Sequence, residues 1–232
     1  MKIFAHIVSV VLHPLLMPTF TYLILFQLAP SVLPAVGDEG KLQLALLIFL
    51  LSFLIPLASI FFLFVLDKIF NARKKMIMSN GEEAMAEQKN ESVFMRSMAL
   101  ESREDRILPF TITTLLYGFV SYVLLFKTPA TFTLLGVVFA STTLCLALVT
   151  LITRFWKISA HSTGIAGVAG FFLAIYLKTD EANLFYAFMV SLLLAGLLMT
   201  CRLYLNLHTL AQVSAGALLG FIISLITMLY FV

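Results

Sequence analysis

Long apolar runs dominate the chain and are separated by short polar segments. Crossing a bilayer takes about 20 residues of α-helix, and seven runs meet or approach that length. They lie near residues 4–29, 42–66, 107–126, 130–153, 163–177, 184–204 and 209–232. We therefore predict six to seven membrane-spanning helices, with the fifth one short.

The first run carries His13, Pro14 and Pro18 in its interior. A proline removes a backbone N–H and clashes with the carbonyl four residues earlier, so we expect this helix to bend there. The run is too long for a signal-peptide core and no small-residue cleavage site follows it, so we expect a helix of the mature protein. We interpret His13 and the nearby His6 as packing residues.

Composition supports a membrane protein. Hydrophobic residues make up 61% of the chain, charged residues only 12%, and the mean hydropathy is +1.04, which excludes an ordinary soluble domain. The predicted fold class is all-α, a polytopic transmembrane helical bundle. The two cysteines, Cys145 and Cys201, lie within predicted helices without metal-ligand spacing and indicate neither a disulfide nor a zinc site. The net charge is only +3, and basic residues lack aromatic interleaving, so nucleic acid is not an expected partner.

One sizeable polar stretch, residues 67–106, holds eight Lys or Arg and eight Asp or Glu. Its Arg73-Lys74-Lys75 run follows a helix and would either meet anionic lipid headgroups, at about 1 kcal/mol per charge, or anchor the topology. Residues 81–104 have a helix-forming composition with interspersed apolar positions, as in a helix lying on a membrane surface. We therefore expect two N-terminal helices over 1–66, this polar loop over 67–106, and a helical core over 107–232.

Ionisable side chains stand at the ends of four apolar runs. Arg106 opens the third run, His161 precedes the fifth, Arg202 closes the sixth and His208 opens the seventh. The chain crosses twice between Arg106 and His161 and twice again before Arg202, so all four emerge on one membrane face. Such residues are costly beside hydrocarbon and indicate a functional site. Arginine forks and helix N-termini both bind phosphate oxygens, so we predict a phosphate site.

Small residues follow His161 at a spacing of three. Gly164, Gly167 and Gly170 would let the fifth helix approach its neighbours closely, as small residues do in membranes. We interpret them mainly as packing residues.

Two motifs at these helix ends resemble those of the type 2 phosphatidic acid phosphatase superfamily. The family's second motif reads Pro-Ser-Gly-His, and this chain has Ile158-Ser159-Ala160-His161. The third reads Ser-Arg, five residues, His, three residues, Asp, three residues, Gly; the chain has Cys201-Arg202, then His208, Gln212 and Gly216. The order, the Arg-to-His spacing and the helix-end placement agree, and the resemblance covers residues 103–220.

The first motif of the family, Lys, six residues, Arg-Pro, matches less well. Arg106 is followed by Ile107-Leu108-Pro109, and Ala99 stands seven positions before it. Arg103 or Lys157 would then supply the second cation of that motif.

The resemblance implies a two-step phosphoryl transfer by an integral membrane lipid phosphatase. His208 would attack phosphorus, His161 would protonate the leaving oxygen, and Arg106 and Arg202 would clamp the equatorial oxygens. Ser159 and the Ala160 N–H would complete the clamp, with no metal or other cofactor. The substrate would be a lipid whose tails stay in the bilayer, such as phosphatidic acid, a prenyl pyrophosphate such as undecaprenyl pyrophosphate, or phosphatidylglycerophosphate.

The main departure from the family is Gln212, which stands where an aspartate usually orients the nucleophile. A glutamine carbonyl still accepts the ring N–H but carries no charge, and in a Ser-His-Asp triad the matching amide costs about 10⁴ in rate. The alternative function is therefore a non-catalytic protein that binds or transports lipid phosphates. A haem-binding bundle with facing histidines fits less well, because the neighbouring arginines suit an anion.

Charge asymmetry predicts the orientation in the membrane. With seven spans, 12 of the 15 Lys and Arg lie on the face of the site, and Lys41, Lys127 and Lys178 lie on the other. The positive-inside rule then places the site on the cytoplasmic face of the cell (inner) membrane. The sequence makes no prediction of an oligomeric state.

Overall fold

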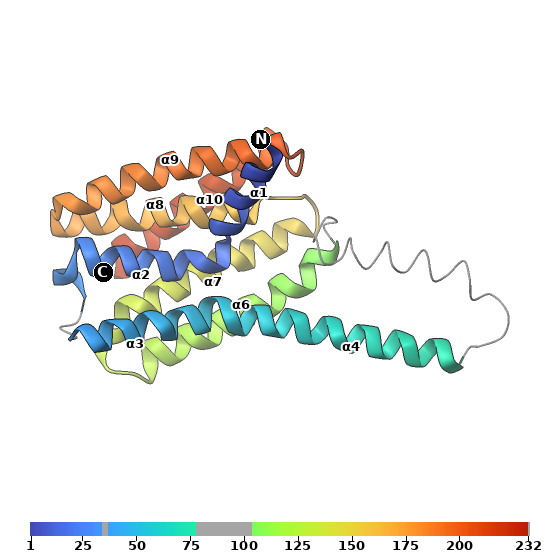
Figure 1. Cartoon of the computed structure of the whole chain (residues 1–232). Coiled ribbons are helices and arrows are strands. Elements are labelled where there is room, and N and C mark those ends of the chain that lie inside the picture. Colours follow the sequence, from blue (N-terminus) through green and yellow to red (C-terminus); the bar gives the residue numbers. More distant parts are fainter. Residues whose placement is uncertain (34–36, 78–103, 232) are drawn as a thin grey trace.

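The computed structural model describes residues 1–33, 37–77 and 104–231, and over this part of the chain every regular element is a helix (Figure 1). Within it, seven helices are long and apolar enough to cross a membrane. They are Lys2–Leu28, Glu39–Phe62, Arg106–Phe126, Ala130–Thr153, Ala160–Thr179, Ala182–Tyr204 and Leu210–Phe231. The helical bundle and its seven spans confirm the prediction from the apolar runs.

The first two spans are interrupted, and the later ones are continuous, the fourth beginning with the short η4 (Ala130–Phe132). The elements in order are α1 (Lys2–Val11), η1 (Pro14–Leu16), α2 (Met17–Leu28), η2 (Pro30–Val32), α3 (Asp38–Phe49), the π-helical turn η3 (Leu50–Leu54), α4 (Ile55–Ile77), α6 (Glu104–Phe126), η4 (Ala130–Phe132), α7 (Thr133–Thr153), α8 (Ala160–Thr179), α9 (Ala182–Tyr204) and α10 (Leu210–Phe231). The fifth span, α8, has 20 residues and is not short as expected. Its first turn holds His161, Ser162 and Thr163, which do not extend an apolar run.

The first span is broken, where the sequence predicted a bend. α1 ends at Val11, and His13 adopts extended backbone angles (φ −67°, ψ 135°) before η1 begins at Pro14. Pro14 has no N–H to continue the helical ladder, and Pro18 occupies the first turn of α2, where a proline is tolerated. The two prolines thus end one helix and start the next inside a single span.

The central helix of the bundle is α8, which contacts α10, α9, α7, α2 and η1. The backbone of α10 packs directly against the backbone of α8. A Cβ built on Gly216 would lie only 2.6 Å from the Ser159 carbonyl oxygen, so no side chain fits there. Cβ atoms on Gly170 and Gly220 would likewise collide with backbone carbonyls of the facing helix. The predicted role of the α8 glycines in close packing is confirmed, and Gly216 and Gly220 supply the matching surface.

Gly220→Ala is expected to destabilise the bundle, because the new methyl meets the Thr163 carbonyl, which cannot move without shifting α8. Overpacking of this kind costs about 1–3 kcal/mol, measurable as a lower midpoint of thermal unfolding in detergent. Gly196→Ala on α9 is the matched control, because nothing lies within 4 Å of its added Cβ and alanine favours a helix. Equal midpoints for the two variants would contradict the packing argument.

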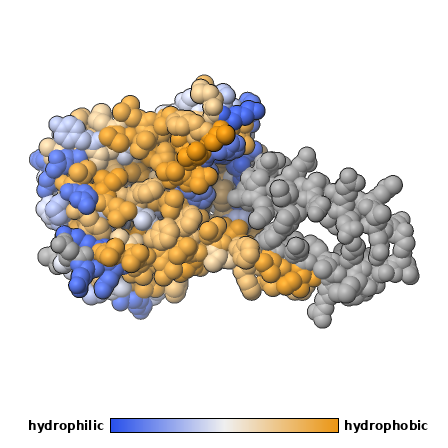
Figure 2. Space-filling view, in the orientation of Figure 1, coloured by the Kyte–Doolittle hydropathy of each residue, from blue (hydrophilic) through white to orange (hydrophobic). Residues whose placement is uncertain are grey.

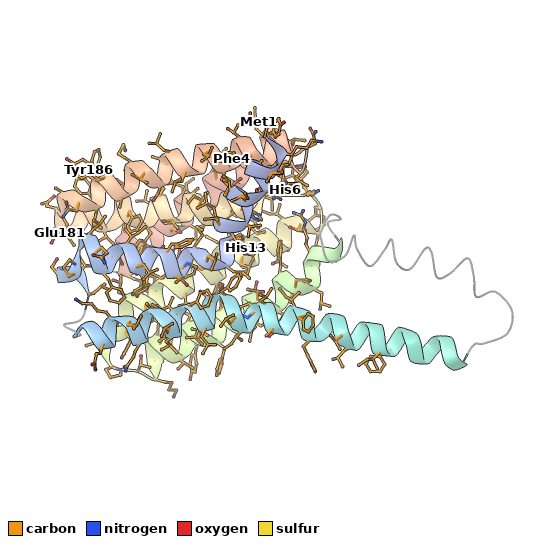
Figure 3. The ribbon with its side chains drawn as sticks, viewed as in Figure 1. Met1, Phe4, His6, His13, Glu181 and Tyr186 are labelled. Atoms are coloured by element: carbon orange, nitrogen blue, oxygen red, sulfur yellow. The ribbon has the colours of Figure 1, made fainter. Side chains whose placement is uncertain are left out.

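The surface of the bundle is divided as in a membrane protein. Figure 2 shows an apolar belt across the middle of the molecule and hydrophilic residues toward its ends. Met1 lies at one end of the bundle and Glu181 at the other (Figure 3). At the Glu181 end, Ser31 Oγ donates to Glu181 Oε1 at 2.6 Å and ties η2 to the start of α9. The chain is a multi-pass membrane protein.

The polar loop predicted over residues 67–106 falls largely outside the described residues. The helix preceding it, α4, continues to Ile77 beyond the end of the second span at Phe62 and runs past the bundle in Figure 1. The amphipathic helix expected over 81–104, and Arg103, lie outside the described part of the chain.

Candidate phosphate site

The four ionisable residues predicted to share one membrane face do come together. Arg106, His161 and Arg202 line a single cavity of about 970 Å³, and the charges of Arg106 and Arg202 act on His208, which is buried beside it. The start of α8 is joined to the first turn of α10 by a hydrogen bond from Ser159 N–H to the Gln212 carbonyl, 3.3 Å long. The start of α6, the start of α8, the end of α9 and the start of α10 thus meet at one end of the bundle.

The tautomer of His208 is fixed by the glutamine four residues later. Gln212 Oε1 lies 3.0 Å from His208 Nδ1 and also accepts the Thr209 backbone N–H at 3.2 Å. A backbone N–H can only donate, so the oxygen and not the amide nitrogen must face both groups. Nδ1 of His208 therefore donates its proton to Gln212, and the lone pair of the ring is left on Nε2.

Two polar atoms of this site are buried without a partner. Within the described part of the chain, the buried side-chain atoms that lack one are His208 Nε2, Arg202 Nε and Tyr22 Oη. Leaving such an atom unpaired costs about 1–3 kcal/mol. The lone pair of His208 Nε2 could meet an electrophilic centre, and the N–H of Arg202 could donate to an oxyanion. A phosphate group offers both.

The surroundings of His208 keep its ring neutral. Burial, followed by the positive charges of Arg106 and Arg202, lowers its pKa from the ordinary 6.5 to about 4; Lys157 adds to the effect and the Gln212 hydrogen bond opposes it. A neutral imidazole with a free nitrogen is the nucleophilic form of histidine. At neutral pH, the His208 ring is therefore neutral, with its lone pair on Nε2.

The start of α8 carries a capping serine and two backbone donors. Ser159 is fully buried and caps the helix, since its Oγ accepts the Ser162 N–H at 3.3 Å and the Ser162 hydroxyl at 3.0 Å. Ala160 and His161 follow it in the first turn, where N–H groups have no intrahelical acceptor. Ser159, predicted as part of a phosphate clamp, thus caps α8, and the N–H groups of Ala160 and His161 are the backbone donors beside it.

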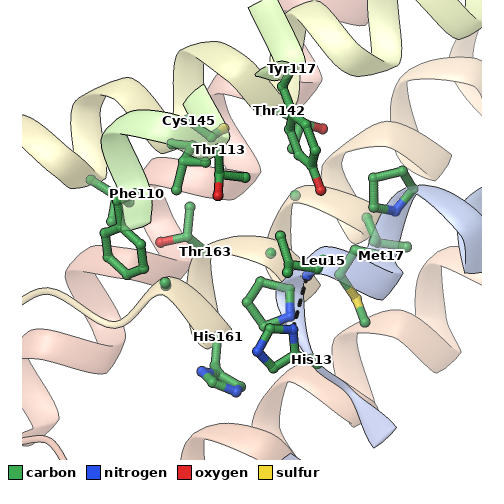
Figure 4. Close-up of a pocket in the computed structure, with 18 of the residues that line it drawn as sticks. His13, Leu15, Met17, Phe110, Thr113, Tyr117, Thr142, Cys145, His161 and Thr163 are labelled. Atoms are coloured by element: carbon green, nitrogen blue, oxygen red, sulfur yellow. Dashed lines mark hydrogen bonds between the residues drawn. The ribbon is translucent and has the colours of Figure 1, made fainter. Parts of the chain in front are cut away.

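The structure adds one residue that the sequence interpretation assigned to packing. His13 lines the same cavity, and its ring centroid lies 5.3 Å from that of His161, with the two planes 84° apart (Figure 4). The sequence feature that could have identified His13 is its place next to a proline inside an apolar run, because interrupted membrane helices often form binding sites.

The cavity continues from the charged end into an apolar interior. Its walls include Leu57 and Phe61 from α4, Tyr117 from α6 and Phe171 from α8. Thr113, Thr142 and Thr163 add hydroxyls along the way (Figure 4). One end of the cavity suits an anion, and most of its length suits hydrocarbon.

Comparison with known proteins adds no relative to this picture. The chain matches no family model, no curated protein and no solved structure.

Proposed function

We propose that this protein is an integral membrane phosphatase that hydrolyses a phosphomonoester or pyrophosphate on a lipid. The observation that carries the proposal is the unpaired Nε2 of His208, held in its lone-pair tautomer by Gln212 and lying in the field of two buried arginines. The sequence resemblance to the type 2 phosphatidic acid phosphatases suggests the same residue as nucleophile.

In the proposed first step, the lone pair of His208 Nε2 forms a bond to phosphorus while the bond to the leaving oxygen breaks. His161, protonated in the presence of the bound phosphate, transfers its ring proton to that oxygen. Arg106, Arg202 and the first-turn N–H groups of α8 stabilise the equatorial oxygens.

In the proposed second step, water attacks the phosphohistidine and the P–N bond breaks. His161, now neutral, accepts the proton of the attacking water, and the lone pair returns to Nε2. The products are the dephosphorylated lipid and inorganic phosphate. Every proton and electron pair is accounted for by the two histidines, so these residues need no redox partner.

A lipid substrate is favoured by the shape of the cavity. Its apolar interior would take the hydrocarbon of a lipid whose phosphate lies at the arginines. Val10, Leu57 and Leu108 line the cavity and are exposed, and they come from the first three spans, between which a lipid would enter from the bilayer. Phosphatidic acid, a prenyl pyrophosphate and phosphatidylglycerophosphate all have the required chemistry.

The test is phosphate release by the purified protein from a panel of these three lipids in mixed micelles. We expect release from at least one of them, at a rate above that of a micelle without protein. Absence of release from the whole panel would contradict the proposal.

A second candidate function is favoured by one observation. Gln212 is neutral, so a phosphohistidine formed on His208 would lack the carboxylate that offsets its positive charge. The site would then bind or transport a lipid phosphate without turnover. Tight binding of a panel lipid by protein that releases no phosphate would support this function.

We also propose that the site faces the cytoplasm, because its side of the membrane carries 12 of the 15 Lys and Arg. Phe155→Cys lies on the site side and Thr179→Cys on the other; both positions are exposed, and neither change alters the charge. In intact cells, a membrane-impermeant maleimide is expected to label Thr179→Cys and to label Phe155→Cys only after lysis. The reverse pattern would place the site outside.

A further inference from the structure

The break in the first span places His13 against His161. The ring of His13 packs at a right angle to that of His161, with 5.3 Å between the centroids (Figure 4). His13 stands at the break itself, in extended backbone between the end of α1 at Val11 and Pro14.

His13 is itself held in one orientation. Its Nδ1 accepts the Leu15 N–H at 3.3 Å, which caps η1, and the ring also packs edge-on to Phe53 with centroids 6.4 Å apart. An Nδ1 that accepts a hydrogen bond carries no proton, so the ring proton is on Nε2. The His13 ring is thus held in one orientation beside His161.

The broken segment is braced by the second span. Thr19 Oγ1 and Ser52 Oγ lie 3.0 Å apart and share a hydrogen bond. The Ser52 carbonyl accepts the Tyr117 hydroxyl at 2.5 Å, and Ser52 stands in the π-helical turn η3, a type of element frequent at functional sites. The first three spans therefore hold the break in place.

We propose that His13 is a positioning residue for His161, so that the broken first span fixes the direction in which the general acid presents its ring to the leaving oxygen. The inference rests on the proposed function, in which His161 is that acid. Displacing a catalytic group typically lowers the reaction rate about 10²-fold. If the leaving group needs no proton, displacing the general acid should leave the rate nearly unchanged.

The decisive variant is His13→Asn. Asparagine can cap η1 as His13 does but removes the ring that packs on His161. Two substrates are compared: a lipid phosphate, whose alkoxide leaves only with a proton, and p-nitrophenyl phosphate, whose phenolate leaves without one. We expect kcat on the lipid phosphate to fall about 10²-fold and kcat on the aryl phosphate to change by less than about threefold.

His13→Ala loses the cap as well as the ring, so it separates folding from positioning. We expect it to unfold at a lower temperature than His13→Asn while showing the same dependence on the leaving group. Equal losses on both substrates, or no loss on the lipid phosphate, would overturn the inference and leave the phosphatase proposal intact.

A second measurement tests the positioning without turnover. In ¹⁵N-histidine-labelled wild-type protein, the His161 ring nitrogens are expected to give the signals of one tautomer, and in His13→Asn those of a mixture. Unchanged His161 signals would overturn the inference, even if the wild type releases no phosphate and the proposed function has failed.

Discussion

Replacing His208 with alanine is expected to reduce phosphate release to the background rate. Removing a nucleophile on which all turnover depends costs about 10⁴-fold or more, and no other histidine has an unpaired buried nitrogen within the described residues. The cavity and both arginines survive the change, so binding of the lipid phosphate should persist. Initial rates with the best lipid of the panel, and binding of the same lipid, give the two readouts.

Two companion experiments sharpen this test. Thr200→Ala is the matched control, because Thr200 lies on the exposed side of α9 and bonds only to the Gly196 carbonyl one turn earlier. Acid-labile, base-stable labelling of the wild type by a ³²P-lipid should be absent in His208→Ala. A His208→Ala protein that keeps a tenth of the wild-type rate would remove His208 as nucleophile.

The bundle could be predicted from the sequence because, in a membrane protein, the length of an apolar run indicates whether it spans the bilayer. A run of about 20 apolar residues has few alternatives to a spanning helix, and six of the seven spans were predicted at nearly their full length. The start of α8 was missed because its first turn holds three polar residues, His161, Ser162 and Thr163, of which the last two are buried. Hydropathy cannot distinguish such a turn from a loop.

The candidate site was predictable where the argument depended only on topology. An even number of crossings placed Arg106, His161 and Arg202 on one face, and the cavity brings them together. His13 was missed because it lies inside the first span and belongs to neither motif. Its contact with His161 depends on the break in that span, and the spacing of residues does not reveal the geometry of a break. The helix cap made by Ser159 was not predicted, since a serine before a helix can cap it or bind a ligand.

The orientation of the Gln212 amide is a further feature that only the structure supplies. The sequence predicted that its carbonyl could accept the ring N–H of His208. The additional contact with the Thr209 N–H excludes the flipped amide, which would have left Nε2 protonated. A neutral residue can therefore preserve the tautomer, and what it fails to supply is charge.

Gln212→Glu is accordingly expected to raise kcat, because it puts a carboxylate oxygen where the amide oxygen now lies, at the same chain length. The phosphohistidine is cationic once Nε2 is bonded to phosphorus, and a carboxylate at Nδ1 stabilises it. In a Ser-His-Asp triad the carboxylate is worth about 10⁴ over the amide; since the tautomer is already correct here, we expect about 10²-fold. Gln212→Asp should give less, because its side chain is one methylene shorter.

The pH profile of Gln212→Glu provides an independent check. Burial and the two arginines lower the pKa of His208 from 6.5 to about 4, so kcat/KM should stay level as the pH falls to about 5 and decline through 4 as the ring is protonated. A neighbouring negative charge favours the imidazolium, so the decline should move to higher pH in Gln212→Glu.

Gln212→Leu, which offers no acceptor, should lower kcat because Nδ1 is no longer fixed as the donor. If Gln212→Glu turns over as slowly as the wild type with an unshifted acid limb, residue 212 does not support the nucleophile.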